Sequence, residues 1–169
     1  MDNKIQKLDA IIAAPELGST VYYAAPFREK LYASEQWQNK SIQCFHLALG
    51  LVFLTKKEAI QAAERMIIAS INFAIKHDAF THIPSENTIY YVALPTSLVS
   101  YEPSYSGFIP ICPRSVERGL IYNNSHDAKE CVKEMLTSIR YASNLAWVGV
   151  FSYTKWTACY IESKYKLSS

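Results

Sequence analysis

Cys44 and His46 lie one residue apart, a spacing that could provide half of a metal site. Zinc sites in proteins usually take four ligands, so further ligands would have to come from elsewhere in the chain. The candidates that follow in the sequence are His77, Asp78 and His82. Cys112 matches Cys44 in the second half of the chain, but Arg114 stands where a second histidine would be needed. We therefore expect Cys44 to be a buried structural thiol, with no metal and no cofactor.

Two further groups of residues could supply a nucleophile. Ser125, His126 and Asp127 are the residue types of a hydrolase triad, but a triad is assembled from distant segments, and consecutive side chains at a helix start point apart. Cys131 precedes the apolar Val132, and a cysteine in apolar surroundings is unreactive because its pKa is raised. The five glycines are spread singly, which excludes a glycine-rich phosphate loop. We therefore expect a protein that is not an enzyme, with a small enzyme lacking a recognisable motif as an alternative.

The charge balance narrows the classes of partner. The net charge is +2 and the pI is about 8.3, below the value near 9 that is typical of dedicated nucleic-acid-binding domains, and far from the acidic charge of a DNA mimic.

The longest apolar run, residues 47–54, is too short to span a bilayer, and the first residues contain no apolar signal segment. The four cysteines form no CxxC pair, as is usual for reduced thiols. These features predict a cytoplasmic protein without a membrane partner, with its oligomeric state open.

An internal repeat organises most of the chain. The segment Gly50–Ala59 aligns with Gly119–Ala128 at an offset of 69 residues (119 minus 50), with matching glycine, leucine and alanine. Upstream, Thr20–Ala25 aligns with Thr88–Ala93 at an offset of 68 residues. One inserted residue before the second glycine segment would reconcile the two offsets. The alignment predicts two copies of one strand–arm–strand–helix unit.

Each copy carries the same local signals. Val21–Tyr23 and Ile89–Tyr91 are rich in β-forming residues, and a short apolar strand follows each arm. A helix then begins at a capping box made by Thr55 and Glu58. The equivalent cap in the second copy consists of Asn124 and Asp127. Apolar residues at helical spacing follow both caps, namely Ala59, Ala63, Met66, Ile67, Ile71 and Ala74 in the first helix and Ala128, Val132, Met135, Ile139 and Ala142 in the second.

The predicted fold is therefore α+β, with two tandem ββα repeats with antiparallel sheet, a short N-terminal helix and a C-terminal β-hairpin. Residues 1–18 form the N-terminal helix and lead-in, residues 19–80 the first repeat and residues 81–143 the second. Residues 144–169 form the hairpin, and all four parts belong to one compact domain.

Val21–Tyr23, Trp37 and the segment Gly50–Ala59 together make a strand, a loop with a tryptophan, a Gly-x-x-Phe strand and a Thr-x-x-Glu-Ala helix start. This pattern resembles one found in small uncharacterised proteins of bacteriophages and other mobile elements, and it covers about two thirds of the chain. The second copy departs from it, with no tryptophan in its arm and Asn124 in place of the threonine. The resemblance implies an accessory role such as inhibition of a host defence complex, of anti-CRISPR or anti-restriction type.

The two arms, residues 26–43 and 95–111, share little sequence although they occupy corresponding places. The first is charged and has a helical character, whereas the second is rich in tyrosine. Loops diverge freely, but exposed Tyr, Trp and Arg side chains are also the residues that dominate binding interfaces. The residues that we expect to contact a partner are Arg28, Lys30, Tyr32, Trp37, Tyr101, Tyr105 and Phe108.

The expected function is therefore non-catalytic binding of a host protein or ribonucleoprotein complex. Binding of nucleic acid is the main alternative, because tyrosines on a sheet could stack on bases. The side chains that could then contact phosphates are Arg28, Lys30, Lys40, Arg114 and Arg118.

Overall fold

The computed structural model describes residues 13–85, 88–95, 104–105 and 112–139. In chain order its elements are β1 (Thr20–Ala24), β2 (Tyr32–Gln36), α1 (Ser41–Ala48), β3 (Val52–Phe53), α2 (Lys56–Ala74), β4 (Ile89–Val92), β5 (Ser104–Tyr105), α3 (Pro113–Glu117), β6 (Ile121–Tyr122) and α4 (Ser125–Ile139). The predicted N-terminal helix falls mostly on residues 1–12 and the predicted C-terminal hairpin on residues 144–169, and both segments lie outside the described residues.

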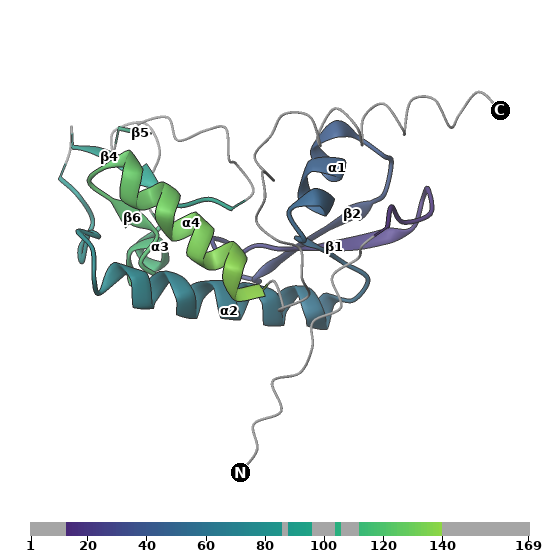
Figure 1. The fold of residues 1–169 in the computed structure, drawn as a ribbon, viewed down its shortest axis with the longest axis horizontal. Coiled ribbons are helices and arrows are strands. Elements are labelled where there is room, and N and C mark those ends of the chain that lie inside the picture. Colours follow the sequence, from purple (N-terminus) through teal and green to yellow (C-terminus); the bar gives the residue numbers. More distant parts are fainter. Residues whose placement is uncertain (1–12, 86–87, 96–103, 106–111, 140–169) are drawn as a thin grey trace, which may run out of the picture.

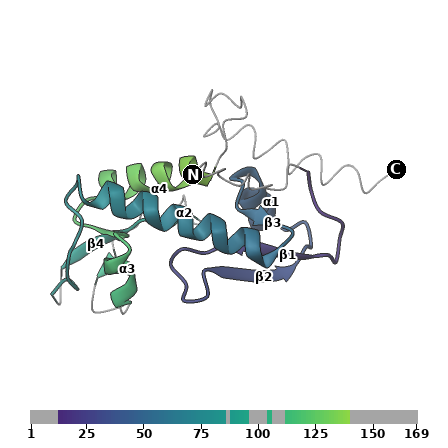
Figure 2. The same cartoon turned by 90° about the horizontal axis from the view of Figure 1, so that it is seen from below.

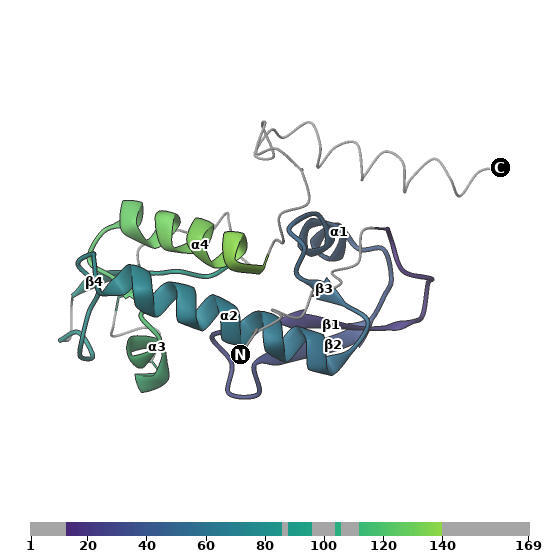
Figure 3. The same ribbon diagram turned by 60° about the horizontal axis from the view of Figure 1, so that its bottom comes forward.

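These elements form an α+β fold with antiparallel sheets, which confirms the predicted fold class. β1 is the central strand of a three-stranded sheet between β2 and β3, and β4 is the central strand of another between β5 and β6. Helices α1 and α2 lie on opposite sides of the first sheet, and α4 lies beside α2 (Figures 1 and 3). Figure 2 shows α3 and α4 on opposite sides of β4. Helices therefore lie on both sides of the first sheet, and α4 packs on β4 and β6 of the second.

Strand pairing sets the register of the two sheets. Tyr22 pairs with Phe53 in the first sheet, and Tyr91 pairs with Tyr122 in the second, each 69 residues further on (91 minus 22 and 122 minus 53). The pairing of β1 with β2 and that of β4 with β5 follow the same offset. The offset of 68 expected for the first strands is therefore wrong by one residue, and no insertion is needed before Gly119. A shift of one residue turns every side chain of a strand to the other face of the sheet. Where neighbouring residues are similar in type, the register therefore depends on which of them must be buried.

A glycine turn leads into β3 and another leads into β6. Gly50 has a φ of 72° and Gly119 a φ of 64°, a left-handed conformation that glycine adopts without the steric cost of a Cβ atom. After the first turn the Leu51 amide donates to the His46 carbonyl at 3.0 Å, and an equivalent bond of 2.9 Å forms in the second half. The two glycines therefore end α1 and α3 in the same way.

The predicted helix caps are confirmed. Thr55 Oγ1 accepts a hydrogen bond from the Glu58 amide at 3.2 Å. Asn124 Oδ1 accepts one from the Asp127 amide at 2.8 Å. In both helices the side chain of the cap also bonds the carboxylate three residues later. Each cap satisfies an amide that the first turn of a helix leaves without an intrahelical partner.

One hydrophobic core spans both halves of the chain, with Met66 of α2 and Met135 of α4 fully buried within it. The apolar residues predicted for α4 are buried as far as Ile139. In α2 the prediction is wrong near the end, because Ile71 is 37% exposed and Ser70 is fully buried. The Ser70 hydroxyl donates to the Arg118 carbonyl at 2.6 Å, so α2 and the turn after α3 meet through a small polar residue.

The first arm does not have the expected helical character throughout. Its residues 32–36 form β2, and only its end belongs to a helix, α1, which begins at Ser41. The pairing of Tyr32 with Ala24 and of Gln36 with Thr20 extends the first sheet along the whole of β1. Backbone pairing with a neighbouring strand therefore outweighs the local preference of a charged segment.

Candidate functional site

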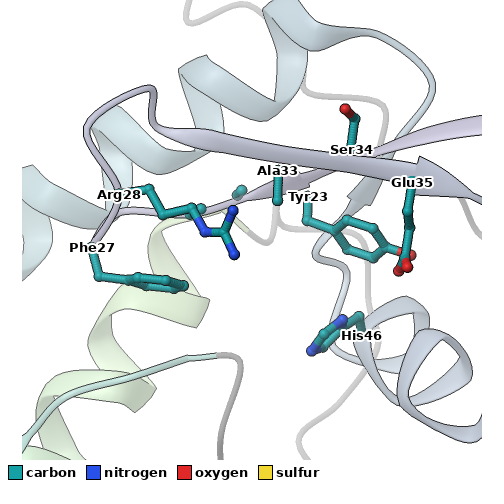
Figure 4. A pocket seen from close by; sticks show the side chains of 9 residues that line it. Tyr23, Phe27, Arg28, Ala33, Ser34, Glu35 and His46 are labelled. Atoms are coloured by element: carbon teal, nitrogen blue, oxygen red, sulfur yellow. The ribbon is translucent and has the colours of Figure 1, made fainter.

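A hollow of about 300 Å³ lies between the β1–β2 hairpin and α1 (Figure 4). Tyr23 comes from β1, Glu35 from β2 and His46 from α1, while Phe27 and Arg28 come from the turn that joins the two strands. The remaining wall is small and mostly apolar, and consists of Ala24, Ala25, Ala33 and Ser34. Aromatic, cationic and acidic side chains thus converge on one concave place.

Alternation along the strands explains why these residues meet. Tyr23 pairs directly with Ala33, and Glu35 pairs with Val21, so all four side chains lie on one face of the sheet. Helix α1 covers that face and places the His46 ring edge-on to the Tyr23 ring, with 5.2 Å between the centroids. The hollow remains where the hairpin extends beyond the helix.

The Tyr23 hydroxyl is the buried polar group of the hollow. The residue is 4% exposed, and its hydroxyl lies next to the Glu35 carboxylate. Burial raises the pKa of Tyr23 well above its usual range, and the adjacent Glu35 carboxylate raises this pKa further. The side chain is therefore a neutral phenol at physiological pH, able to donate or accept a hydrogen bond.

The turn of the hairpin is held from the other half of the chain. One nitrogen of the Arg118 guanidinium donates to the Pro26 carbonyl at 2.6 Å and to the Arg28 carbonyl at 2.9 Å. Arg114 forms an ion pair with Glu29, with 2.9 Å between the charged atoms. These contacts fix the backbone of the turn while the side chain of Arg28 stays exposed at the hollow.

Trp37 is wrong as a predicted partner contact, because it is 1% exposed and packs with Val21 and Val52 beneath α1. Its backbone amide donates to the Ser19 carbonyl, which continues the strand pairing past the end of β2. The buried Gln43 stabilises the segment around Trp37, since its amide group forms hydrogen bonds with the backbone of residues 36, 38 and 40. Burial of a large indole ring stabilises the core, which explains why Trp37 packs inside the fold.

The other predicted contacts are distributed over two faces of the hairpin. Arg28 and Lys30 are exposed in the turn. Tyr32 is half-buried on the α2 side, where its ring lies 6.2 Å from the Tyr22 ring and 4.8 Å from the Lys56 ammonium. Tyr101 and Phe108 lie outside the described residues, and Tyr105 is described as part of β5 by its backbone alone. The structure therefore brings Tyr32 and Lys56 together and turns Arg28 toward the hollow.

Several of the residues weighed for a metal site or for catalysis make contacts within the fold. Cys44 is half-buried, where a buried thiol was expected, and it donates to Asn39 Oδ1 at 3.2 Å. Cys131 is fully buried as expected, and desolvation raises its pKa to about 12. Asp127 belongs to the α4 cap, and its Oδ1 atom lies 3.5 Å from Nδ1 of His77. Within residues 13–85, 88–95, 104–105 and 112–139, no group of three or more His, Cys, Asp or Glu side chains is arranged to hold a metal ion.

Sequence reasoning missed Tyr23, Glu35 and His46 as a group. Tyr23 was predicted as a strand residue and His46 was weighed only as a ligand beside Cys44. Pairing residues 20–24 with residues 32–36 would have shown that Tyr23 and Glu35 are neighbours, because Glu35 lies two positions from Ala33, the partner of Tyr23.

No family model matches the chain, and no curated protein or solved structure matches it significantly. None of the helices in the described ranges is both long enough and apolar enough to cross a membrane.

Proposed function

We propose that the protein is a non-catalytic binding protein that acts on another macromolecule, and specifically a phage or mobile-element inhibitor of a host defence complex. The observation that carries the proposal is the β1–β2 turn, which is exposed in its side chains but fixed in its backbone by Arg118 and by the pair of Arg114 with Glu29. A preorganised loop loses little conformational entropy on binding, so its contacts are retained as affinity.

The chemistry of this surface favours an acidic region of a protein partner. Lys30 is exposed in the turn, and Lys56 lies over the ring of Tyr32 at the start of α2. Tyrosine and arginine are favoured in the centres of interfaces, and lysines at the rim steer association with an acidic partner. Because Glu29 and Glu35 are interspersed with the cations and the net charge is only +2, a protein fits better than the uniform charge of a nucleic-acid backbone.

The test is capture from bacterial lysate combined with phage plating on cells that carry a defence complex. The tagged protein should retain one host complex and raise the efficiency of plating. The double variant Lys30→Glu with Lys56→Glu should lose both effects, because like charges would face the acidic partner. The control Lys76→Glu makes the same charge change at an exposed position after α2 and should behave as the parent protein.

Two results would contradict the proposal. One is capture that the double variant leaves unchanged. The other is capture that disappears after nuclease treatment and falls steeply with salt, which would favour the nucleic-acid alternative.

We also propose that the chain arose by duplication of one ββα unit. Support comes from the common offset of 69 residues in strand pairing, glycine turns and helix caps. Support also comes from Met66 and Met135, which occupy equivalent buried positions at that offset. An experimental structure in which residues 50–66 and 119–135 fail to superpose would contradict the duplication.

A further inference from the structure

We propose that the hollow between the β1–β2 hairpin and α1 binds a small flat zwitterion, with its ammonium and carboxylate groups at opposite ends of an aromatic body. This proposal does not depend on the macromolecular partner proposed above. It rests on the size of the hollow, on the charges at its two ends and on the composition of the wall between them.

The size sets the class of ligand. A volume of about 300 Å³ is at the lower limit of the pockets that bind small organic molecules. A nucleotide or a peptide would extend far outside it, whereas a single substituted ring fits within it. The hollow also has the usual composition of a ligand site, a mostly apolar wall with a few convergent polar groups.

The charges set the orientation of the ligand. Arg28 comes from the turn. Glu35 lies three residues after Tyr32, the residue at which β2 begins after the turn. Three residues of strand correspond to roughly 10 Å, and Figure 4 shows the two side chains at opposite ends of the hollow. A guanidinium recognises a carboxylate through parallel hydrogen bonds, and a carboxylate recognises an ammonium group. A complementary ligand therefore carries both charges, well separated.

The wall between the charges fits an aromatic ring. Phe27 lies at the Arg28 end, with 6.0 Å from its ring centroid to the guanidinium carbon. Tyr23 and His46 form the opposite part in an edge-on pair, and Ala33 leaves room between the two ends. Aromatic side chains favour a planar ligand through offset or edge-on contacts.

Tyr23 provides the aromatic contact at the Glu35 end. The residue lines the hollow, and its hydroxyl lies next to the Glu35 carboxylate. An ammonium group at the Glu35 carboxylate would lie beside the Tyr23 ring, whose π electrons attract a cation.

The experiment is calorimetric titration with three matched probes at low salt. The zwitterion 4-(aminomethyl)benzoate should bind about tenfold or more tightly than benzylamine, which lacks the acid, and than benzoate, which lacks the amine. Arg28→Ala should weaken binding of the zwitterion and of benzoate by about tenfold and leave benzylamine unchanged. Glu35→Gln should do the reverse, weakening the zwitterion and benzylamine but not benzoate.

Two further variants separate the site from general effects. Lys30→Ala removes a neighbouring exposed cation that does not line the hollow, so it should leave all three affinities unchanged. Tyr23→Phe keeps the ring that lines the hollow, so it should retain the preference for the zwitterion over the two probes that carry one charge. The proposal is overturned by an absence of binding at millimolar zwitterion, by equal affinities for the three probes, or by an equal effect of Lys30→Ala and Arg28→Ala.

Discussion

Gly119 meets two constraints at once, a left-handed backbone and a close approach to α2. A Cβ atom at this position would lie 2.7 Å from the Ala74 Cβ atom and 3.0 Å from the Ser70 carbonyl oxygen. Gly50 has a similar φ but nothing within 4 Å of its would-be Cβ atom. The two glycines therefore separate the cost of backbone conformation from the cost of steric overlap.

We expect Gly50→Ala to lower the free energy of unfolding by about 1 kcal/mol, the cost of a left-handed alanine. Gly119→Ala should lower it by about 2–4 kcal/mol, because the overlap with α2 adds a packing cost of roughly 1–3 kcal/mol. Urea denaturation of the two variants beside the parent protein measures both values. Equal losses would mean that α2 moves away from the turn at little cost.

The buried thiol of Cys131 makes stability depend on pH in the alkaline range. Its pKa is about 12 in the folded protein and about 9 in the unfolded chain. Above pH 9 the unfolded thiol loses its proton while the folded thiol keeps it, so unfolding releases a proton and is favoured as pH rises. The stabilising contribution is therefore complete below pH 9 and is lost between pH 9 and pH 12.

We expect Cys131 to lower the free energy of unfolding by roughly 1 kcal/mol between pH 9 and pH 10, as the linkage relation predicts for one such group. Tyr23, Tyr90 and Tyr122 also have raised pKa values, and because their ordinary pKa is 10 they add a further fall that lies mainly above this window. Urea titrations at the two pH values provide the measurement. Cys131→Ala, which cannot ionise, serves as the control and should show a clearly smaller fall.

At the scale of the elements, α2 and α4 begin with caps of the same geometry built from different residues. Thr55 uses a hydroxyl and Asn124 an amide oxygen, yet each accepts from the amide three residues later. Both residue types rank among the preferred N-caps. The two helices should therefore depend on their caps to a similar degree.

Thr55→Ala and Asn124→Ala should each lower the free energy of unfolding by about 1 kcal/mol, because a helix amide loses its acceptor. Thr137→Ala is a matched control, since Thr137 is exposed within α4 and alanine has the higher helix propensity. Its stability should be unchanged or slightly raised. Thermal melts in which both cap variants behave like the control would show that the helices do not need these side chains.

At the scale of the whole molecule, polar contacts across the two halves reinforce the shared core. Arg118 follows α3 in the second half and bonds two carbonyls of the hairpin turn in the first, while its own carbonyl accepts from Ser70. Arg114 and Glu29 make a second link, but both side chains are largely exposed. The Arg118 link is partly buried, so water competes with it less strongly than with the exposed pair of Arg114 and Glu29.

Arg118→Ala should lower the free energy of unfolding by about 2 kcal/mol, because two backbone carbonyls lose a charged donor. It should also speed amide hydrogen exchange in residues 25–31, whose turn it holds. Arg114→Ala removes a neighbouring arginine with a solvent-exposed partner and should have a much smaller effect on both quantities. Similar losses for the two variants would mean that solvent exposure does not weaken the second link.

Much of the local structure could be predicted from residue types alone. Thr55 and Asn124 marked two helix starts because a cap needs only a side-chain acceptor and its neighbouring amides. The short strands after the two arms were also expected, but Gly50 and Gly119 lie in left-handed turns that precede those strands. Met66 and Met135 followed from helical spacing, and Cys131 was expected to be buried and inert because it lies beside that apolar stripe.

The site depended on contacts between segments that are distant in the sequence. The burial of Trp37 could not be predicted from its charged neighbours, because it requires β2 to pair with β1 and α1 to cover that face of the sheet. Pairing also set the 69-residue register, since Tyr90 and Tyr91 are alike in type and only their side of the sheet tells them apart. Local preferences determined which segments became capped helices and turns. Tertiary packing decided which aromatic side chains are buried and brought Tyr23, Glu35 and His46 together, because the free energy of burial depends on what covers a side chain.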